Sequence, residues 1–370
     1  MKRLGHRLFE RIALVGLTLS CFAAQARSQD PTPAVEAGRI SDTLRSQAYS
    51  EVRYGQVMPD FDRGYMIQHE FEVTHSPQQP TVAVYDASGK RVLEGRIWPK
   101  GAGIVRIRRT AMTRDGGVLA GGWATLQNGT SPGYVAKTDA QGNTIQSVYT
   151  GHFKPEQICE APDGTVWSLG KAVGSDGLST SDSDTDVVRH YSFEKGLLHS
   201  FLPEETVRSV QHSDHPWFVP FGSFLRCGKD KVSIYLGFTD EYAEISNSSF
   251  ALTRWTLDQS TAQQRKASGL AVTDDGRVYA SFSVHNAYGV SGPYGLTGLY
   301  QVKADLGSSI ARLLPVGGTV DAYGTYGQGE RPPAGALVKL WGADGNQLVL
   351  WRTAEPYASW VSVEKSSTAD

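Results

Sequence analysis

The sequence lacks an excess of charge of either sign. Its 36 Lys and Arg residues nearly balance its 38 Asp and Glu residues, so the formal net charge is -2. A near-neutral protein has no field that draws nucleic acid or an anionic membrane to it, and neither is expected as a partner. After residue 26 no apolar run is long enough to span a bilayer, so we expect no transmembrane anchor.

Motifs of common catalytic sites are also scarce. The sequence has no His-Glu-x-x-His segment and no phosphate-binding loop. This scarcity favours a binding protein over an enzyme, with no cofactor, although it leaves catalysis open. An apolar content of 40% is sufficient for a full core and argues against a disordered chain.

The first 26 residues have the pattern of a signal peptide. A basic start, MKRLGHRLFER, precedes the apolar run IALVGLTLSCFAA and the small-x-small pattern Ala24-Gln25-Ala26. We predict cleavage after Ala26 and a secreted or periplasmic monomer. Lipid attachment at Cys21 is an alternative, but Thr18 occupies a position where such motifs usually have leucine. Export leaves two cysteines, Cys159 and Cys227, as either a disulfide or two buried thiols.

Strand signals dominate the rest of the chain. Segments such as TVAVYD, YVAKTD and FALTRWTL are short and rich in β-branched and aromatic residues. No stretch after the signal peptide has a sustained apolar period of a helix. The sequence therefore predicts an all-β protein.

Two kinds of turn alternate along these strands. The first kind is Asp-Gly-like and is centred on Asp115, Asp163, Asp230, Asp275 and Asp344. The second kind follows a strand that ends in an aromatic or acidic residue, at Asp86, Asp139, Glu194, Asp258 and Asp305. Such residues suit turns because they tolerate positive φ or bond their own backbone. One cycle takes about 55 residues, the length of a four-stranded repeat.

The repeat resembles that of the six-bladed bacterial β-propellers of the NHL-repeat kind. ICEAPDGTVWSLG followed by VVRHYSFEKGLLHSFL has the strand and turn order of their blades. The resemblance implies a propeller over residues 50–365, with a linker or closing strand in 27–49 and a disordered tail in 366–370. An N-terminal strand would complete the last blade; seven blades or an imperfect ring stay open. In the first blade, the innermost strand is expected in EVRYGQV, residues 51–57.

Within this frame the two cysteines end the innermost strands of neighbouring blades, which leaves disulfide formation open. Trp167, Tyr235 and Tyr279 occupy matching places in second strands and are expected between blades. The short turns leave one face of the ring. Longer segments leave the other face, at residues 122–133, 149–157, 174–186, 203–222, 239–249, 285–298 and 317–335. Long loops without structure of their own are usually functional or disordered, so we place the binding site on this long-loop face.

The candidate ligand-binding residues are the donor and aromatic side chains of these segments: His152, His212, Asp214, His215, Trp217, His285, Tyr288 and Tyr294. Imidazole and carboxylate groups suit a transition metal, but a solvated loop anchored by Pro216 accounts equally for the His-x-x-His spacing. Asp182, Asp184 and Asp186 resemble the start of a calcium loop, without its glycine and later acidic ligand.

Two functions follow from this pattern, and a purely structural component of the cell envelope is a third reading. The first is an exported, non-catalytic propeller that binds a protein, peptide or glycan through its long-loop face. The second is a metal-dependent hydrolase or lyase of the lactonase kind, which also uses six-bladed propellers. That resemblance implies acidic and amide ligands in the central channel, with Glu156, His152, His212 and Asp214 as candidates.

Overall fold

The structure, a computed structural model, describes residues 32–39, 60–70, 72–73, 80–173, 186–203, 206, 223–237, 239–258, 266–284, 295–318, 337–352 and 357–363. Residues 1–30 lie outside the described ranges, and Pro31–Asp370 is the unit described below. In the described ranges there is no helix of the length and apolarity needed to cross a membrane.

The first half of this unit contains three sheets, two of four strands and one of five, which we call blades one to three. Blade one consists of β2 (Asp60–Asp62), β3 (Tyr65–His69), β5 (Val82–Tyr85) and β6 (Arg91–Gly95). Blade two consists of β7 (Ala102–Met112), β8 (Val118–Leu126), β9 (Gly133–Thr138) and β10 (Thr144–Gly151), and β4 (Glu72–Val73) pairs with its inner strand. Blade three consists of β11 (Phe153–Glu160), β12 (Val166–Ala172), β13 (Asp186–Ser192) and β14 (Gly196–Pro203).

The second half repeats this antiparallel order in blades four to six. Blade four consists of β15 (Phe224–Cys227), β16 (Lys231–Leu236), β17 (Glu241–Ser246) and β18 (Leu252–Leu257). Blade five consists of β19 (Lys266–Val272), β20 (Val278–Val284), β21 (Gly295–Ala304) and β22 (Ile310–Gly318). Blade six consists of β23 (Leu337–Asp344), β24 (Gln347–Arg352), β25 (Tyr357–Val363) and β1 (Thr32–Arg39).

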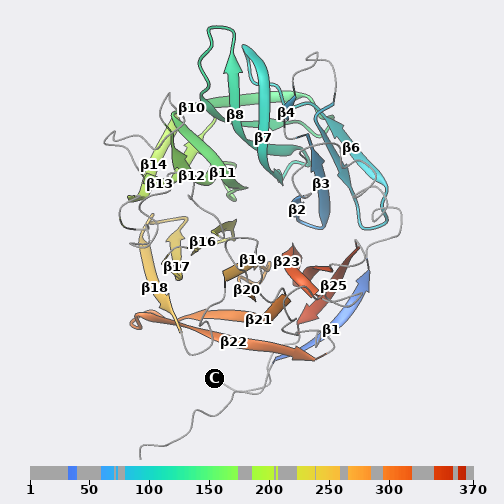
Figure 1. The fold of residues 1–370 in the computed structure, drawn as a ribbon, viewed down its shortest axis with the longest axis vertical. Helices are drawn as coiled ribbons and strands as arrows, with labels where there is room; N and C mark the ends of the chain where they lie inside the picture. The colour runs from blue at the N-terminus through green and yellow to red at the C-terminus, as the bar shows by residue number, and fades with distance from the viewer. Residues whose placement is uncertain are drawn as a thin grey trace, which may run out of the picture. The chain divides into compact units, whose positions relative to one another are not determined.

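The inner strands of the blades form a ring within this unit. β2, β7, β11, β15, β19 and β23 each contact the next strand in that order, and β23 contacts β2 (Figure 1). Four-stranded antiparallel blades arranged around an axis define a β-propeller. The predicted all-β propeller fold is confirmed.

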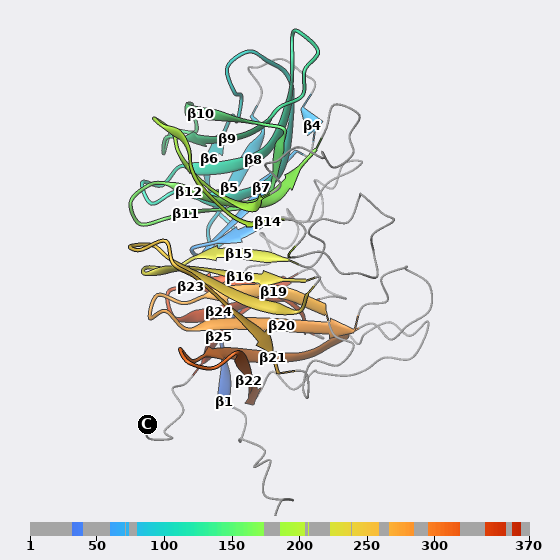
Figure 2. The same ribbon diagram turned by 90° about the vertical axis from the view of Figure 1, so that its left-hand side faces the viewer.

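β1 takes the outermost place in blade six. It pairs antiparallel with β25, with Val35 opposite Ser362, so an N-terminal strand completes a C-terminal blade. β1 also pairs in parallel with β22, and β22 with β18. Figure 2 shows β22 and β1 side by side. The outer edges of blades four, five and six are therefore joined, which covers backbone groups that would otherwise stay unpaired.

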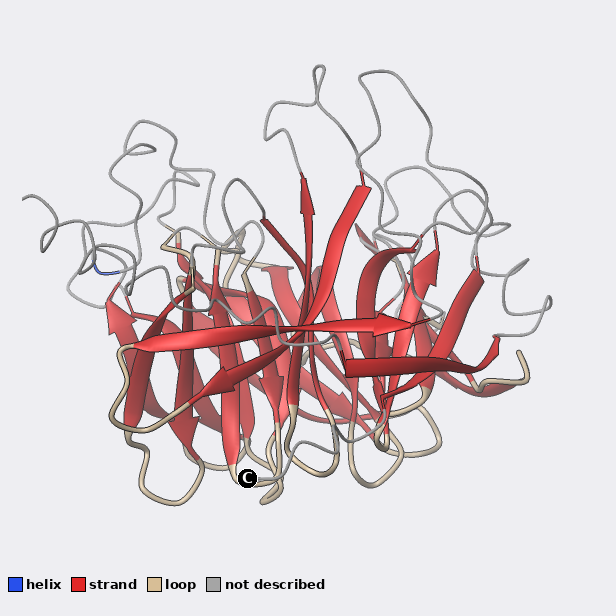
Figure 3. Ribbon diagram, turned by 90° about the horizontal axis from the view of Figure 1, so that it is seen from below, coloured by secondary structure: helices blue, strands red, loops and turns tan. Residues whose placement is uncertain are grey.

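Short turns gather along one edge of the unit, as antiparallel geometry requires (Figure 3). The turn at Asp139 illustrates their chemistry. Its Oδ1 accepts hydrogen bonds from Gln141 N at 3.0 Å and Asn143 N at 2.8 Å, and Gly142 adopts a φ of 84°. The aspartate thus closes the turn with its own side chain, and the glycine supplies the positive φ that other residues rarely adopt.

Blade four departs from the predicted turn order. The predicted third turn at Asp258 is wrong, because Asp258 follows the outermost strand β18. The third turn lies at residues 247–251, where Ser246 Oγ accepts from Ser248 N and Ser249 N, each at 3.3 Å. Phe250 has a φ of 55° there. A turn made of Asn and Ser with a left-handed phenylalanine lacks the Asp and Gly that the prediction used.

Several predicted loops are strands. Residues 149–157 span the end of β10 and the start of β11, and only His152 separates the two strands. Register shifts at Gly151 and at Pro155 absorb the residues that suggested a loop. About half of residues 122–133 and of residues 239–249 is likewise strand, in β8, β9 and β17.

The predicted innermost strand of blade one is also displaced. The structure assigns Asp60–Asp62 to this place, whereas residues 51–57 lie outside the described ranges. The strand is three residues long and carries two aspartates. Aspartate is rare in strands, and polar groups of blade two compensate for it here, as shown below for the site.

Aromatic side chains fill the space between blades. Trp167, Tyr235 and Tyr279, which the sequence predicted there, are almost fully buried. Glycines permit the close approach of blades two and three: a Cβ on Gly121 would lie 2.7 Å from Ile158 Cγ2, and one on Gly133 would lie 1.8 Å from Phe153 O. These contacts set how closely β8 and β9 of blade two approach β11, the inner strand of blade three.

A histidine inside this aromatic packing makes stability depend on pH. His190 stacks on Trp167 with ring centroids 4.2 Å apart, and its Nε2 lies 2.7 Å from Thr165 Oγ1. Burial lowers the pKa of His190 from 6.5 to about 4, against the opposing effect of Asp163. As pH falls from about 6.5 towards 4, only the unfolded chain takes up this proton, so folding loses stability in that window.

We expect this histidine to account for about 1–2 kcal/mol of the loss, after allowance for partial solvent access. Urea unfolding at about pH 7 and about pH 4.5 measures it. His190→Phe keeps the stack and removes the titration, so its stability should fall less on acidification. His152→Gln, at an exposed position, is the matched control. Equal acid sensitivity of the wild type and His190→Phe would contradict the assignment.

Candidate functional site

The predicted ligand-binding residues fall mostly outside the described ranges. This applies to His212, Asp214, His215, Trp217, His285, Tyr288 and Tyr294, and to Asp182 and Asp184 of the calcium-like segment. Asp186 begins β13. His152 is exposed between β10 and β11, and its carbonyl accepts from Val173 N at 2.9 Å. The ligand-binding role of these side chains stays a prediction.

The two cysteines form a disulfide. Cys159 is the last residue but one of β11, and Cys227 is the last residue of β15; their Cα atoms are 5.6 Å apart. The bond joins the inner strands of blades three and four, at the end where each strand enters its first short turn. The alternative of two buried thiols does not hold in this structure.

One motif that is typical of the nucleophilic serine of hydrolases occurs on a hairpin. Gly129-Thr130-Ser131-Pro132-Gly133 matches Gly-x-Ser-x-Gly, whose serine in hydrolases sits between a strand and a helix. Here the segment joins β8 to β9, and Ser131 Oγ lies 3.1 Å from Thr125 Oγ1. Asn128 Oδ1 accepts from Thr130 N at 3.1 Å, so the segment closes an ordinary turn.

Cationic and aromatic side chains meet between blades two and three, on the half of the unit away from the short turns. Their positions follow from the register: Arg106 is opposite Trp123, and Lys154 is opposite Lys171. We call this group the Trp123 surface; it comprises Glu72, Arg106, Arg108, Trp123, Lys154, Glu156 and Lys171.

Two cations of the Trp123 surface are neutralised and another is not. Arg106 Nε lies 2.7 Å from Glu72 Oε2, and Arg108 lies 2.8 Å from Glu156 Oε2. The ammonium of Lys154 lies 5.4 Å from the centre of the Trp123 ring, within cation–π range. Within the described ranges, no hydrogen-bond acceptor or carboxylate contacts it.

The Lys154 ammonium is electrostatically strained. Burial lowers the pKa of Lys154, and the nearby Lys171 and Arg106 lower it further. These effects exceed the opposing influence of Glu156. A negative charge brought to this ammonium would relieve the repulsion, because it would favour the charged form of the lysine.

A cavity of about 800 Å³ lies on the axis of the ring. All six inner strands contribute to its wall, and we call it the axial cavity. It is at the short-turn end, because one turn residue of each blade lines it: Arg63, Arg114, Pro162, Lys229, Asp274 and Gly345.

Asp60 is the centre of a buried charge network in this wall. Its Oδ1 pairs with Arg109, and its Oδ2 accepts from Thr110 N at 2.7 Å and Thr110 Oγ1 at 2.8 Å. His69 Nε2 lies 3.5 Å from the same oxygen. Burial alone would raise the pKa of Asp60, but Arg109 and His69 hold it well below its usual range. This is how an aspartate is accommodated in β2.

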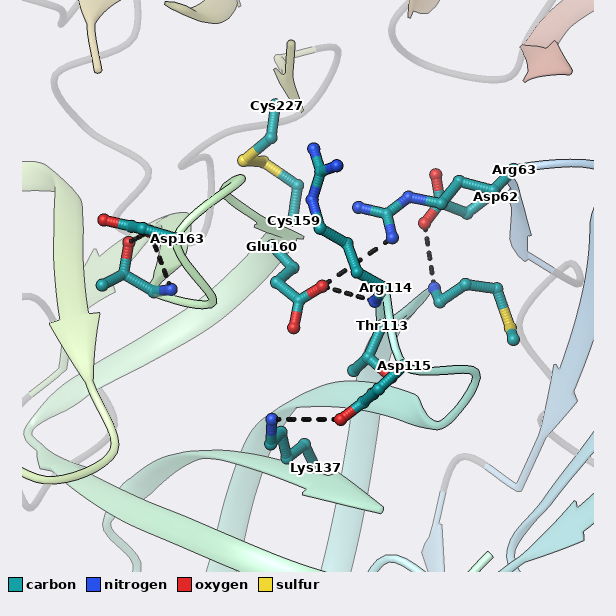
Figure 4. A network of polar contacts seen from close by, with 12 residues as sticks. Asp62, Arg63, Thr113, Arg114, Asp115, Lys137, Cys159, Glu160, Asp163 and Cys227 are labelled. Carbon is teal, nitrogen blue, oxygen red and sulfur yellow. Dashed lines mark hydrogen bonds and ion pairs between the residues drawn. A yellow bond between two sulfur atoms is a disulfide. The ribbon is translucent and has the colours of Figure 1, made fainter. Parts of the chain in front are cut away.

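Two further carboxylates of the wall have fixed partners. Asp62 Oδ2 accepts from Met112 N at 2.9 Å, and Glu160 Oε2 accepts from Arg114 N at 2.6 Å (Figure 4). Arg63 Nη1 lies 3.7 Å from Glu160 Oε2. Burial raises the pKa of both carboxyl groups against the influence of these neighbours. The network thus holds blades one, two and three together around the cavity.

Metal-ligand geometry is not found in the described part of the chain: no three His, Cys, Asp or Glu side chains converge there on one point. Of the four candidates for a lactonase-like site, Glu156 pairs with Arg108, His152 is exposed, and the other two lie outside the described ranges.

The axial cavity and the ring of blades define the class of this molecule as a β-propeller. No protein-family model matches the sequence, and no curated protein matches it.

Several solved structures are similar to this chain. A protein of unknown function from Bacteroides caccae is 13% identical, with a TM-score of 0.40 over 76% of this chain and 83% of that one. The PQQ-bound aldose sugar dehydrogenase of Streptomyces coelicolor is 13% identical, with a TM-score of 0.44 over 90% and 98%. Hydrazine synthase of Kuenenia stuttgartiensis is 12% identical, with a TM-score of 0.43 over 82% and 76%.

Proposed function

We propose that this chain is an exported, non-catalytic binding propeller that holds an acidic glycan on the Trp123 surface. The observation that carries the proposal is the half-buried ammonium of Lys154, which lies over the Trp123 ring without an acceptor in the described ranges. The N-terminal signal pattern supports export, and so does the disulfide, since disulfides persist in oxidising compartments.

The chemistry of the surface suits a carboxylated or sulfated sugar. Lys154 supplies charge that Glu72 and Glu156 do not balance, since these two carboxylates pair with arginines. The indole supplies a rigid apolar body with a polar edge. The surface is on the same side of the unit as the predicted long-loop face.

Binding of polysaccharides to the purified protein without its signal peptide tests the proposal. We expect polygalacturonate or dextran sulfate to bind and neutral dextran not to bind. Lys154→Ala should weaken binding about fivefold to twentyfold, because it removes a charge-assisted contact. Lys303→Ala, at an exposed lysine of blade five, should leave affinity unchanged. Added salt should weaken the interaction, since exposed charges are screened.

Three results would contradict this function. Equal binding of neutral dextran would remove the role of charge. Equal affinities of Lys154→Ala and Lys303→Ala would remove the role of this surface. Binding of polyglutamate with none of either acidic polysaccharide would indicate a polypeptide partner instead of a glycan.

A further inference from the structure

We propose that the axial cavity is a second binding site, which takes a small molecule with one carboxylate or phosphate group through Arg226. The cavity volume of about 800 Å³ is within the range of small-molecule sites, about 300–1,000 Å³. It is separate from the Trp123 surface, so the two proposals stand or fall independently.

The guanidinium of Arg226 has donors to spare. Within the described ranges it makes one hydrogen bond, from Nη1 to Leu225 O at 2.8 Å, whereas a guanidinium carries five N–H donors. In the described ranges no carboxylate oxygen lies within 4.0 Å of this guanidinium, the distance limit for an ion pair. The side chain is half-buried and lines the cavity. A partly desolvated cation with unused donors is costly unless an acceptor reaches it.

The two carboxylates that act on the charge of Arg226, Asp60 and Asp62, do not accept hydrogen bonds from its guanidinium. Burial lowers the pKa of Arg226 to about 10, and Arg109 acts in the same direction, while Asp62 and Asp60 act against them. Asp60 is already committed to Arg109 and Thr110, and Asp62 to Met112 N. These two carboxylates therefore act on Arg226 only at longer range.

The rest of the wall limits the kind of ligand. Asp60 and Asp62 would repel a second negative group, which favours a molecule with a single acidic group. Apolar side chains face the same space, including Phe224, Ile158 and the Phe61–Trp341 pair, whose ring centres are 5.2 Å apart. The wall thus suits a compact acid with an apolar body, whose oxygens accept a bidentate pair from Arg226.

Isothermal titration with benzoate and phenyl phosphate tests this site, with benzyl alcohol as the neutral probe. We expect both anions to bind at one site and benzyl alcohol to bind at least tenfold more weakly, the ratio that one charge-assisted contact supports. Arg226→Gln should lower anion affinity about tenfold or more, and Arg226→Lys should restore part of it. Arg312→Gln, at an exposed arginine paired with Asp305, is the matched control.

Thermal unfolding separates a binding defect from a folding defect. Without ligand, Arg226→Gln should be as stable as the wild type or more stable, because it removes a poorly paired cation. Anions should then raise the melting temperature of the wild type and of Arg312→Gln, and not that of Arg226→Gln. Absence of saturable binding of both anions to the wild type would overturn the proposal. So would unchanged affinity in a folded Arg226→Gln variant.

Discussion

Replacement of Cys159 and Cys227 together by alanine is expected to lower the free energy of unfolding by about 4 kcal/mol. The cysteines are 68 residues apart, and a crosslink over a loop of that length removes chain entropy worth about 4 kcal/mol from the unfolded state. The bond also holds the inner strands of blades three and four together at the axial cavity. Urea unfolding of the wild type and the double variant measures the loss.

The reductant response provides the control for this prediction. Dithiothreitol should shift the unfolding midpoint of the wild type towards that of the double variant, because both then lack the crosslink. It should leave the double variant unchanged. A wild-type midpoint that does not respond to reductant, with free thiols demonstrated, would show that the crosslink contributes little to stability.

The second large effect is expected at Asp60. Asp60→Asn keeps the shape of the side chain but removes its charge, which leaves Arg109 as an unpaired cation in the wall of the cavity. Breaking a buried pair in this way typically costs about 3–5 kcal/mol. Because the folded-state pKa of Asp60 is depressed, its contribution is present above the unfolded value of about 3.8 and is lost only in stronger acid.

An exposed ion pair provides the matched comparison for Asp60. Asp305 and Arg312 lie 3.0 Å apart, and about half of each side chain is exposed. Asp305→Asn should therefore cost less than about 1 kcal/mol. Chemical unfolding of both variants at neutral pH measures the difference. Similar losses would show that the buried network around Asp60 adds no more than a surface pair.

The propeller was predictable because its turns are local. Asp139 and Gly142 form their turn with groups no more than four residues away, so the sequence alone carries the signal. Blade four shows where prediction from Asp and Gly turn residues fails. Its third turn uses Ser246 and Phe250 in place of Asp and Gly, and the prediction therefore passed over it to Asp258.

Strands whose partners are distant gave weaker signals. β1 contains Pro33 and Gly38, which are poor strand formers, and it forms through pairing with β22 and β25 at the other end of the chain. β2 carries Asp60 and Asp62, which belong in a strand only because Arg109, Thr110 and Met112 satisfy them. An N-terminal closing strand could be expected in residues 27–49 from the incomplete last blade, but its bounds within that range could not.

The axial cavity could not be found from the sequence for a similar reason. Arg226 and Asp62 act on one another although more than a hundred and sixty positions separate them along the chain. No short motif links them, and neither residue is unusual in its own segment. Lys154 and Trp123 belong to predicted loop segments that are strands in the structure, so their contact depended on a register that local patterns do not specify.

The pairing of β1 with β25 determines when blade six can be completed during synthesis of the chain. The ribosome makes Thr32–Arg39 long before Tyr357–Val363, because chains are made from the N-terminal end. β1 therefore has no antiparallel neighbour until β25 has been synthesised. A truncated chain that stops before Tyr357 therefore keeps β22 as a partner for β1 but leaves β1 without its antiparallel neighbour.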